Sequence, residues 1–130
     1  MYEAVTRAIR VRVIPDYSEE RSNPDNGEFF WAYTITIINE GGEVVQLKSR
    51  TWRIVDALGH AESIRGPGVV GQTPTIAPGD SFSYTSGCPL KTPSGFMSGS
   101  YDMVGGSGAR FQIQIPAFSL DSPYAVRSVN

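Results

Sequence analysis

The chain has 130 residues, of which 40 % are hydrophobic and 18 % are charged, a composition typical of a folded domain rather than a disordered segment. Its length fits one domain. The formal net charge is −2, and the 11 basic residues are scattered without a run. The sequence therefore offers no basic field that would attract nucleic acid.

The start of the chain and its cysteine content bear on its compartment. The only cysteine, Cys88, cannot form an internal disulfide, so the pattern of a secreted scaffold is not met. Charges at Glu3, Arg7 and Arg10 interrupt any apolar core of a signal peptide. No run approaches the roughly 20 apolar residues needed to cross a bilayer. We expect a cytoplasmic protein with no membrane partner.

The first predicted element is a strand over residues 5–15 that ends at Pro15. Its expected inward residues are Val5, Ile9, Val11 and Val13. Arg7 breaks the alternation, which an edge strand could tolerate, and Val5, Ala8 and Ile9 would also suit a helix. The Val-Arg-Val run favours the strand.

A polar loop over residues 16–28 precedes the strongest strand of the sequence, residues 29–39. One face of this strand carries large apolar side chains at Phe29, Trp31, Tyr33, Ile35 and Ile37. The opposite face is apolar at both ends, at Phe30 and Ile38. A strand with apolar residues on both faces is expected in the middle of a sheet.

Residues 39–43 have the composition of a turn, and we expect them to close a hairpin into a strand over residues 44–56. The alternation of apolar and polar residues changes phase within that strand. Val45 and Leu47 would lie on one face, whereas Trp52 and Ile54 would lie on the other. A β-bulge near residues 49–51 would turn all four inward. Without the bulge, Trp52 would stay partly outside.

The rest of the chain reads as short strands between turns, and no segment reads as a convincing helix. Further strands are expected near residues 63–65, 81–86, 95–105 and 109–118, with a hairpin tip at residues 105–108. Their expected inward residues are Phe82, Tyr84, Met97, Tyr101, Met103, Phe111, Ile113 and Ile115. Six or seven short strands of this kind predict an all-β sandwich or barrel.

The stretch GPGVVG, residues 66–71, matches the glycine pattern of dinucleotide-binding loops. That pattern needs a helix directly after it, so that the helix N-terminus faces the pyrophosphate. Here Pro74 and Pro78 follow within seven residues of Gln72, which excludes a helix. The structural interpretation is a tight turn in which glycines adopt positive φ angles.

The residue types needed for catalysis or metal binding are scarce. His60 is the only histidine. It would therefore have to be the imidazole ligand of any metal site and the base for any serine or cysteine nucleophile, Cys88 included. We interpret His60 as a solvated turn residue and the acidic residues of the 16–28 loop as solubilising. No metal, cofactor or catalytic residue is therefore predicted, and a non-enzymatic binding module is favoured.

Five stretches together resemble the ApaG family, also called the DUF525 domain. They are SNPDNGEFFWAYTITIIN, VVQLKSRTWRIVD, GPGVVGQTPTIAPGDSFSYTSG, TPSGFMSGSYDMV and FQIQIPAFSL. They occur in the family's order and cover about residues 5–121. The resemblance implies a fibronectin type III or immunoglobulin-like β-sandwich of two antiparallel sheets with about seven strands, forming one domain over residues 1–130. It also implies a role in protein–protein contacts, in a bacterial family linked to cobalt resistance and magnesium efflux.

Two binding surfaces follow as hypotheses. The first is a nest of backbone N–H groups that holds a pyrophosphate-type anion, formed by Arg65 as counter-charge and by Gly66, Gly68, Val69, Val70 and Gly71. Pro67 counts against it, because proline has no N–H.

The second surface is a patch for an unidentified protein partner. Its candidates are Phe30 and Ile38, with Lys48 and Arg50 as a polar rim, joined by Trp52 if the bulge is absent. The alternative is that the second sheet or the C-terminal segment covers this face. We expect Phe118 and Leu120 to clamp the tail onto the domain.

Overall fold

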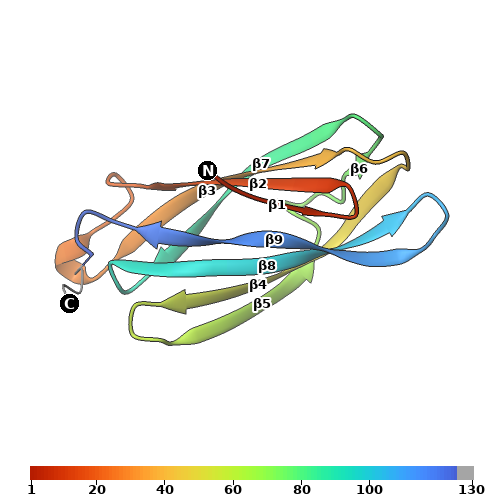
Figure 1. Ribbon diagram of the computed structural model, residues 1–130. Helices are drawn as coiled ribbons and strands as arrows, with labels where there is room; N and C mark the ends of the chain where they lie inside the picture. The colour runs from red at the N-terminus through yellow and green to blue at the C-terminus, as the bar shows by residue number, and fades with distance from the viewer. Residues whose placement is uncertain (126–130) are drawn as a thin grey trace, which may run out of the picture.

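The computed structural model describes residues 1–125, which form two antiparallel β-sheets packed face to face in a fibronectin type III or immunoglobulin-like sandwich (Figure 1). One sheet has the order β1-β2-β3-β7 and the other β5-β4-β8-β9, with β6 also paired to β4. The strands are β1 (Tyr2–Thr6), β2 (Ile9–Tyr17), β3 (Phe29–Asn39), β4 (Val45–Asp56), β5 (Ala61–Pro67), β6 (Thr75–Ile76), β7 (Ser81–Leu90), β8 (Ser94–Gly105) and β9 (Arg110–Asp121). The only helical piece in these residues is a 3₁₀ turn, Pro24–Asn26, and no helix there could span a membrane.

Residues 2–17 form a hairpin of two strands, so the prediction of one strand over residues 5–15 is wrong. β1 pairs with β2 in a register that sets Thr6 opposite Ile9, and the two-residue turn between them places Arg7 and Ala8 at φ 50° and 63°. Such a turn needs positive φ at both central residues. The hairpin reverses the chain, so Val5 is exposed, whereas Ile9, Val11 and Val13 are buried as expected.

Strand β3 is central to its sheet, as its apolar faces predicted. It pairs with β2 on one side and with β7 on the other. The predicted inward residues of β3 are all buried. Tyr33 packs edge-on against Trp52 of the opposite sheet with ring centroids 5.4 Å apart, so this aromatic contact joins the two sheets.

The connection from β3 to β4 crosses from one sheet to the other, and the expected hairpin at residues 39–43 is wrong. β4 pairs with β5, β6 and β8, and not with β3. The buried Asn39 holds the crossing: its Nδ2 donates to the carbonyl oxygens of Glu43 and Ile76 at 2.7 and 2.9 Å. Its Oδ1 accepts from the Gly41 N–H at 3.0 Å. Each hydrogen-bonding group of a buried amide is thereby used.

Two β-bulges correct the parity of long strands. The predicted bulge in β4 is present, one residue before the predicted range of 49–51: the extra residue is Lys48, because the register passes from Leu47–Met103 directly to Ser49–Asp102. In β9, Met97 faces Phe118 whereas Gly99 faces Ile115, so an extra residue lies near Pro116. This second bulge turns both halves of β9 toward the core. Phe118 and Leu120 are buried, which confirms the expected clamp.

The sandwich is closed along one side and open along the other. On the closed side β9 lies beside β1, where the Gln114 N–H donates to Thr6 Oγ1 at 3.1 Å and the Ser119 N–H donates to the Tyr2 hydroxyl at 3.3 Å. On the other side, within residues 1–125, β5 pairs only with β4 and β7 pairs only with β3. A cleft opens between these two edge strands.

Candidate functional site

The candidate site is the β5–β7 cleft, which we define as two adjoining cavities of about 380 and 260 Å³ between the edges of the two sheets. The cavities share four lining residues: Tyr33, Arg50, Trp52 and Ser86. Two apolar side chains stay exposed at the rim of the cleft. They are Ile64 of β5, exposed by 39 %, and Val70 of residues 66–71, which we call the glycine loop, exposed by 52 %. The cleft thus combines an aromatic floor, one cation and an apolar rim, which is the usual make-up of a binding site.

Arg50 is fixed in the cleft by the glycine loop. Its Nη1 donates to the carbonyl oxygens of Pro67 and Gly68 at 3.0 and 2.9 Å. A Cβ added at Gly66 would lie 3.1 Å from Nη1, so the missing side chain of Gly66 makes room for the guanidinium. Among residues 1–125, only Nη1 of the three guanidinium nitrogens of Arg50 has a hydrogen-bond partner. Nε and Nη2 can serve a ligand.

Three tyrosines lie around Arg50 between the sheets. The buried hydroxyls of Tyr84 and Tyr101 hydrogen-bond to each other. Burial raises the pKa of Tyr33, Tyr84 and Tyr101, while the positive charge of Arg50 opposes that increase in each pKa. The tyrosine side chains therefore remain neutral hydroxyls beside a cation.

The glycine loop is a turn between β elements, which confirms that no helix starts after Gly71. Gly68 and Gly71 have φ angles of 58° and 80°. Val69 and Gln72 exchange N–H···O bonds of 2.8 and 2.9 Å, and the Gly68 N–H donates to the Lys48 carbonyl oxygen at 2.8 Å. The amides of Gly68 and Val69 are thus already used, and the loop turns carbonyl oxygens toward Arg50. Anion binding by the loop stays a prediction, and the N–H groups of Gly68 and Val69 would have to leave their present partners to take part in it.

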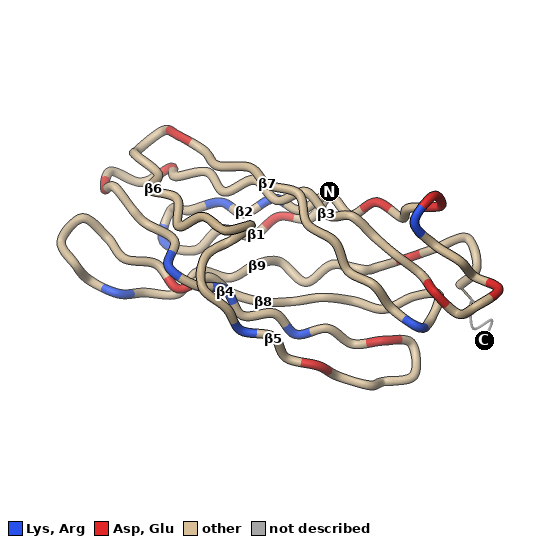
Figure 2. The backbone as a smooth tube through the Cα atoms, turned by 180° about the vertical axis from the view of Figure 1, so that it is seen from behind, with Lys and Arg blue, Asp and Glu red and all other residues tan. Residues whose placement is uncertain are grey.

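Arg65 lies on the other face of its sheet from Arg50. Its Nη2 bonds to Asp102 Oδ2 at 3.2 Å, beside a hollow also lined by Lys48 and Arg110. Hydrogen bonds from Ser49 and Gln112, together with the charge of Arg65, hold the pKa of Asp102 below its ordinary value. Figure 2 shows Lys and Arg positions gathered along β4 and β5 and acidic positions at the turn between them. Arg65, the predicted counter-charge for an anion at the glycine loop, is thus paired with a carboxylate on the outer face of its sheet.

The predicted protein-binding patch is divided by the fold. Trp52 is only 3 % exposed, because the β4 bulge turns it inward, so the condition for its joining the patch is not met. Lys48 is exposed on the outer face while Arg50 lines the cleft, and the two do not form one rim. Ile38 is half-buried on the outer face of β3.

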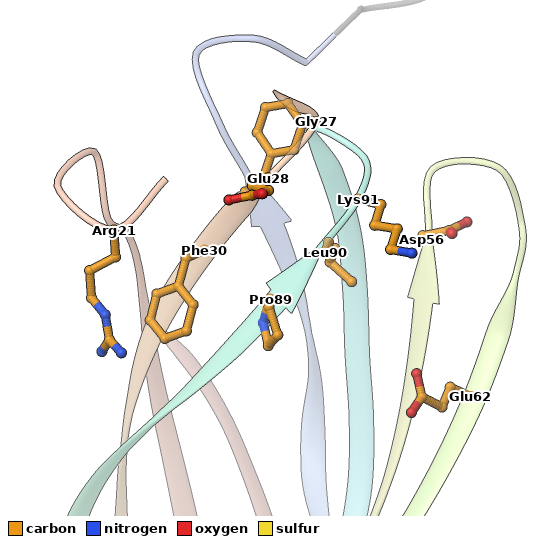
Figure 3. Close-up of a pocket in the computed structure, with 10 residues that line it drawn as sticks. Arg21, Gly27, Glu28, Phe30, Asp56, Glu62, Pro89, Leu90 and Lys91 are labelled. Carbon is orange, nitrogen blue, oxygen red and sulfur yellow. The ribbon is translucent and has the colours of Figure 1, made fainter. Parts of the chain in front are cut away.

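Phe30 is partly covered on that same outer face. The Arg21 guanidinium lies over its ring, with Cζ 4.1 Å from the centroid, and a Cβ at Gly87 would lie 2.2 Å from the ring. Phe30 also lines a cavity of about 490 Å³ that adjoins the β5–β7 cleft at Glu62, Pro89 and Leu90. Figure 3 shows Phe30 and Arg21 on one side of this cavity and Asp56 and Lys91 on the other.

His60 and Cys88 lie in different environments. His60, in the β4–β5 turn, is 78 % exposed, and its Nδ1 is 3.1 Å from Asp56 Oδ2, which fits the interpretation as a turn residue. Cys88 is buried in β7, and burial raises the pKa of its thiol to about 11, so little reactive thiolate forms. In residues 1–125 no three His, Cys, Asp or Glu side chains gather at a point where they could hold a metal ion.

One sequence signal, and one pairing that only the structure reveals, bear on this site. Arg50 shares the parity of Trp52 and Ile54 after the bulge, which would have indicated that it faces inward. The glycine of the loop closest to Arg50, Gly66, sits opposite it in the β4–β5 register. Neither the Tyr84–Tyr101 pair nor the opening between β5 and β7 has a local sequence signal, because both depend on how the sheets pack.

Comparison with known proteins identifies the family of this chain. The profile of the ApaG domain (DUF525) matches residues 19–105, and Protein ApaG of Brucella anthropi is 55 % identical over 130 residues, covering 100 % of both chains. The chain belongs to the ApaG family. A crystal structure described as the ApaA protein of Bordetella pertussis is 44 % identical with a TM-score of 0.87, covering 90 % of this chain and 95 % of that one.

A more distant likeness concerns the fold of this ApaG-family chain alone. The C-terminal domain of wzt superposes with a TM-score of 0.51 at 9 % identity, covering 98 % of this chain and 88 % of that domain. At such low identity the two share a β-sandwich, and a fold hosts many unrelated functions.

Proposed function

We propose that this ApaG-family protein is a non-catalytic binding module of the cytoplasm, in which residues 1–130 act as one domain that recognises another protein. The supporting observation is the β5–β7 cleft, in which two edge strands from different sheets face each other across an apolar and aromatic floor. Unpaired strand edges and exposed apolar rims are the two devices by which β-sandwiches bind other chains.

The rim of the cleft adds to this support. Ile64 and Val70 are large apolar side chains that remain exposed beside Arg50. Arginine and aromatic rings are enriched where proteins bind each other, and exposed apolar side chains beside them extend such a surface.

The test uses proteins captured from a lysate by the immobilised chain, purified and then measured directly by calorimetry. Three variants are compared: Ile64→Asp in the cleft, Ile38→Asp on the outer face of β3, and Ile14→Asp on the outer face of β2. Ile14 is 54 % exposed, so its substitution is the matched surface control. We expect the Ile64→Asp variant to lose binding by tenfold or more, while Ile14→Asp binds as the wild type does.

Two other outcomes are informative. Loss of binding with Ile38→Asp alone would move the contact to the outer face of the first sheet and leave the binding function in place. If no captured protein binds the purified chain directly, the proposed function is wrong.

A further inference from the structure

We propose that the β5–β7 cleft holds an extended peptide segment of the partner, and that Arg50 receives an Asp or Glu side chain of that segment. This inference rests on the proposed function and adds the site and the chemistry of the ligand.

The argument begins with Arg50, the one basic side chain shared by both cavities of the cleft. Two loop carbonyl oxygens hold Nη1, while Nε and Nη2 have no hydrogen-bond partner among residues 1–125. A guanidinium presents its N–H groups in a planar fork that matches a carboxylate. Because the loop already fixes the side chain, little rotamer freedom remains to be lost when a carboxylate binds.

The shape of the cleft favours a peptide over a small anion. Beyond Arg50 the cleft continues past Ile54, Ile64 and Leu90, and these apolar walls would not contact an inorganic anion. They would contact alternate side chains of an extended chain. The unpaired edges of β5 and β7 offer backbone N–H and C=O groups to the same segment.

The charges along the cleft place the acidic side chain at the Arg50 end. Glu62 lines the opposite end of the same cavity and, with Asp56, the cavity that adjoins it. A carboxylate of the peptide would be repelled there, whereas Arg50 lies next to Val70 and Gly71. No ion pair joins Arg50 to Glu62 within the described chain, so the guanidinium is not already neutralised by a partner.

Val70 marks the mouth of the cleft at that end. It has a φ of 44°, which is an outlier for a β-branched residue, and yet its side chain is exposed. Strain of this kind persists where the surrounding structure holds it, and often at ligand sites. Its position lets a single surface substitution change the charge beside Arg50 without touching the core.

The test selects binders from a phage-displayed library of random nonapeptides against the wild-type protein. The enriched sequence is then synthesised, together with its analogue in which Gln replaces the acidic residue. We expect Asp or Glu at one fixed position of the enriched peptides, and at least tenfold weaker binding by the Gln analogue. Enrichment without an acidic position, or no enrichment at all, overturns the inference.

Two matched pairs of variants place the peptide in the cleft. Val70→Asp adds a negative charge at the mouth of the cleft, and Val70→Asn introduces a side chain of the same shape as Asp without the charge. Both Asp and Asn accept a positive φ better than valine does. We expect Val70→Asp to weaken binding of the acidic peptide tenfold or more relative to Val70→Asn. Arg50→Gln should have the same effect, and Arg65→Gln on the outer face should have none.

The Val70 pair keeps the test decisive if Arg50→Gln does not fold. Equal affinities of Val70→Asp and Val70→Asn overturn the inference. If a purified partner binds the protein while all these variants bind that partner equally, the inference about the cleft fails and the proposed function stands.

Discussion

The Nη1 of Arg50 donates to the carbonyl oxygen of Gly68 at 2.9 Å, so a glycine motif associated with anion binding here binds a cation. The pattern of glycines is explained by backbone geometry and by the room that Arg50 needs. Whether the glycines bring N–H groups or C=O groups to a site depends on the path of the chain after the motif, and here that path is extended.

The two positive-φ glycines of the loop should differ in their tolerance of alanine. At Gly71 a Cβ meets nothing within 4 Å, whereas at Gly68 it would lie 2.3 Å from the Gln72 carbonyl oxygen. Gly71→Ala should cost about 1 kcal/mol for the left-handed conformation alone, and Gly68→Ala should cost clearly more, because the backbone has to move. Urea unfolding of both variants measures this, and equal costs would show that the loop adapts freely.

Anion titration tests the use of the loop amides. The N–H groups of Gly68 and Val69 donate to the carbonyl oxygens of Lys48 and Gln72. Adding pyrophosphate or diadenosine tetraphosphate to the ¹⁵N-labelled protein should therefore leave these two amide signals unshifted at millimolar ligand. Shifts at both amides would mean that the loop rearranges to form the anion nest.

The hydroxyl pair between the sheets predicts non-additive stability effects. Tyr84→Phe leaves the fully buried Tyr101 hydroxyl without its partner, which should cost about 1–3 kcal/mol in the free energy of unfolding. The double variant, with Phe at both positions, should be less destabilised than Tyr84→Phe alone, because no hydroxyl is then stranded. Denaturant unfolding of both single variants and the double variant gives the coupling energy, and additive costs would contradict the pairing.

The pKa of Asp102 gives a pH-dependent prediction. Its carboxylate accepts a hydrogen bond from Ser49 Oγ at 2.6 Å, and its pKa lies below the ordinary value of 3.8. A lowered folded-state pKa stabilises the fold above the unfolded-state pKa, and this stabilisation is lost as the pH falls through the folded-state value. Ser49→Ala should raise the pKa of Asp102, and its destabilising effect should be present at neutral pH and shrink below pH 3.8.

Carbon-detected NMR titration of the Asp102 carboxyl group measures that pKa directly. Thr51→Ala removes a neighbouring hydroxyl that has no hydrogen bond to Asp102 in the described residues, and it should leave the pKa unchanged. An unshifted Asp102 in Ser49→Ala would rule out the serine as the main cause.

The turn of the N-terminal hairpin offers a stabilising substitution. Ala8 has a φ of 63°, which costs an L-residue roughly 1–2 kcal/mol and glycine much less. Ala8→Gly should therefore raise the free energy of unfolding by about 1 kcal/mol. Ala4→Gly, in the extended strand β1 of the same hairpin, is the control and should lower it. Destabilisation by Ala8→Gly would show that the turn is not strained.

The same hairpin shows where prediction from the sequence stops. Alternation predicted β3, β7 and β8 because each strand buries one face, and the slip of parity in β4 predicted its bulge. The turn at Arg7 and Ala8 was not predicted, because neither residue is a usual turn former. The connection after Asn39 looked like a hairpin because local composition does not say which strand will be the neighbour.

The candidate site was predictable only in part for the same reason. The sequence indicated that residues 66–71 form a turn without a helix, and it named Arg50 as a candidate. It could not show that Arg50 and Arg65 lie on opposite faces near that turn, because the face follows from the exact place of the bulge at Lys48. The cleft itself exists only after the two sheets have packed.

One wall of the β5–β7 cleft belongs to each sheet, so its width follows from the thickness of the core. The contact of Tyr33 with Trp52 spans that thickness beside Arg50. A smaller side chain at Trp52 would bring the two walls nearer to each other, and a bulkier one would separate them. Affinity for whatever enters is thus adjustable through the aromatic floor that separates the sheets as well as through the rim.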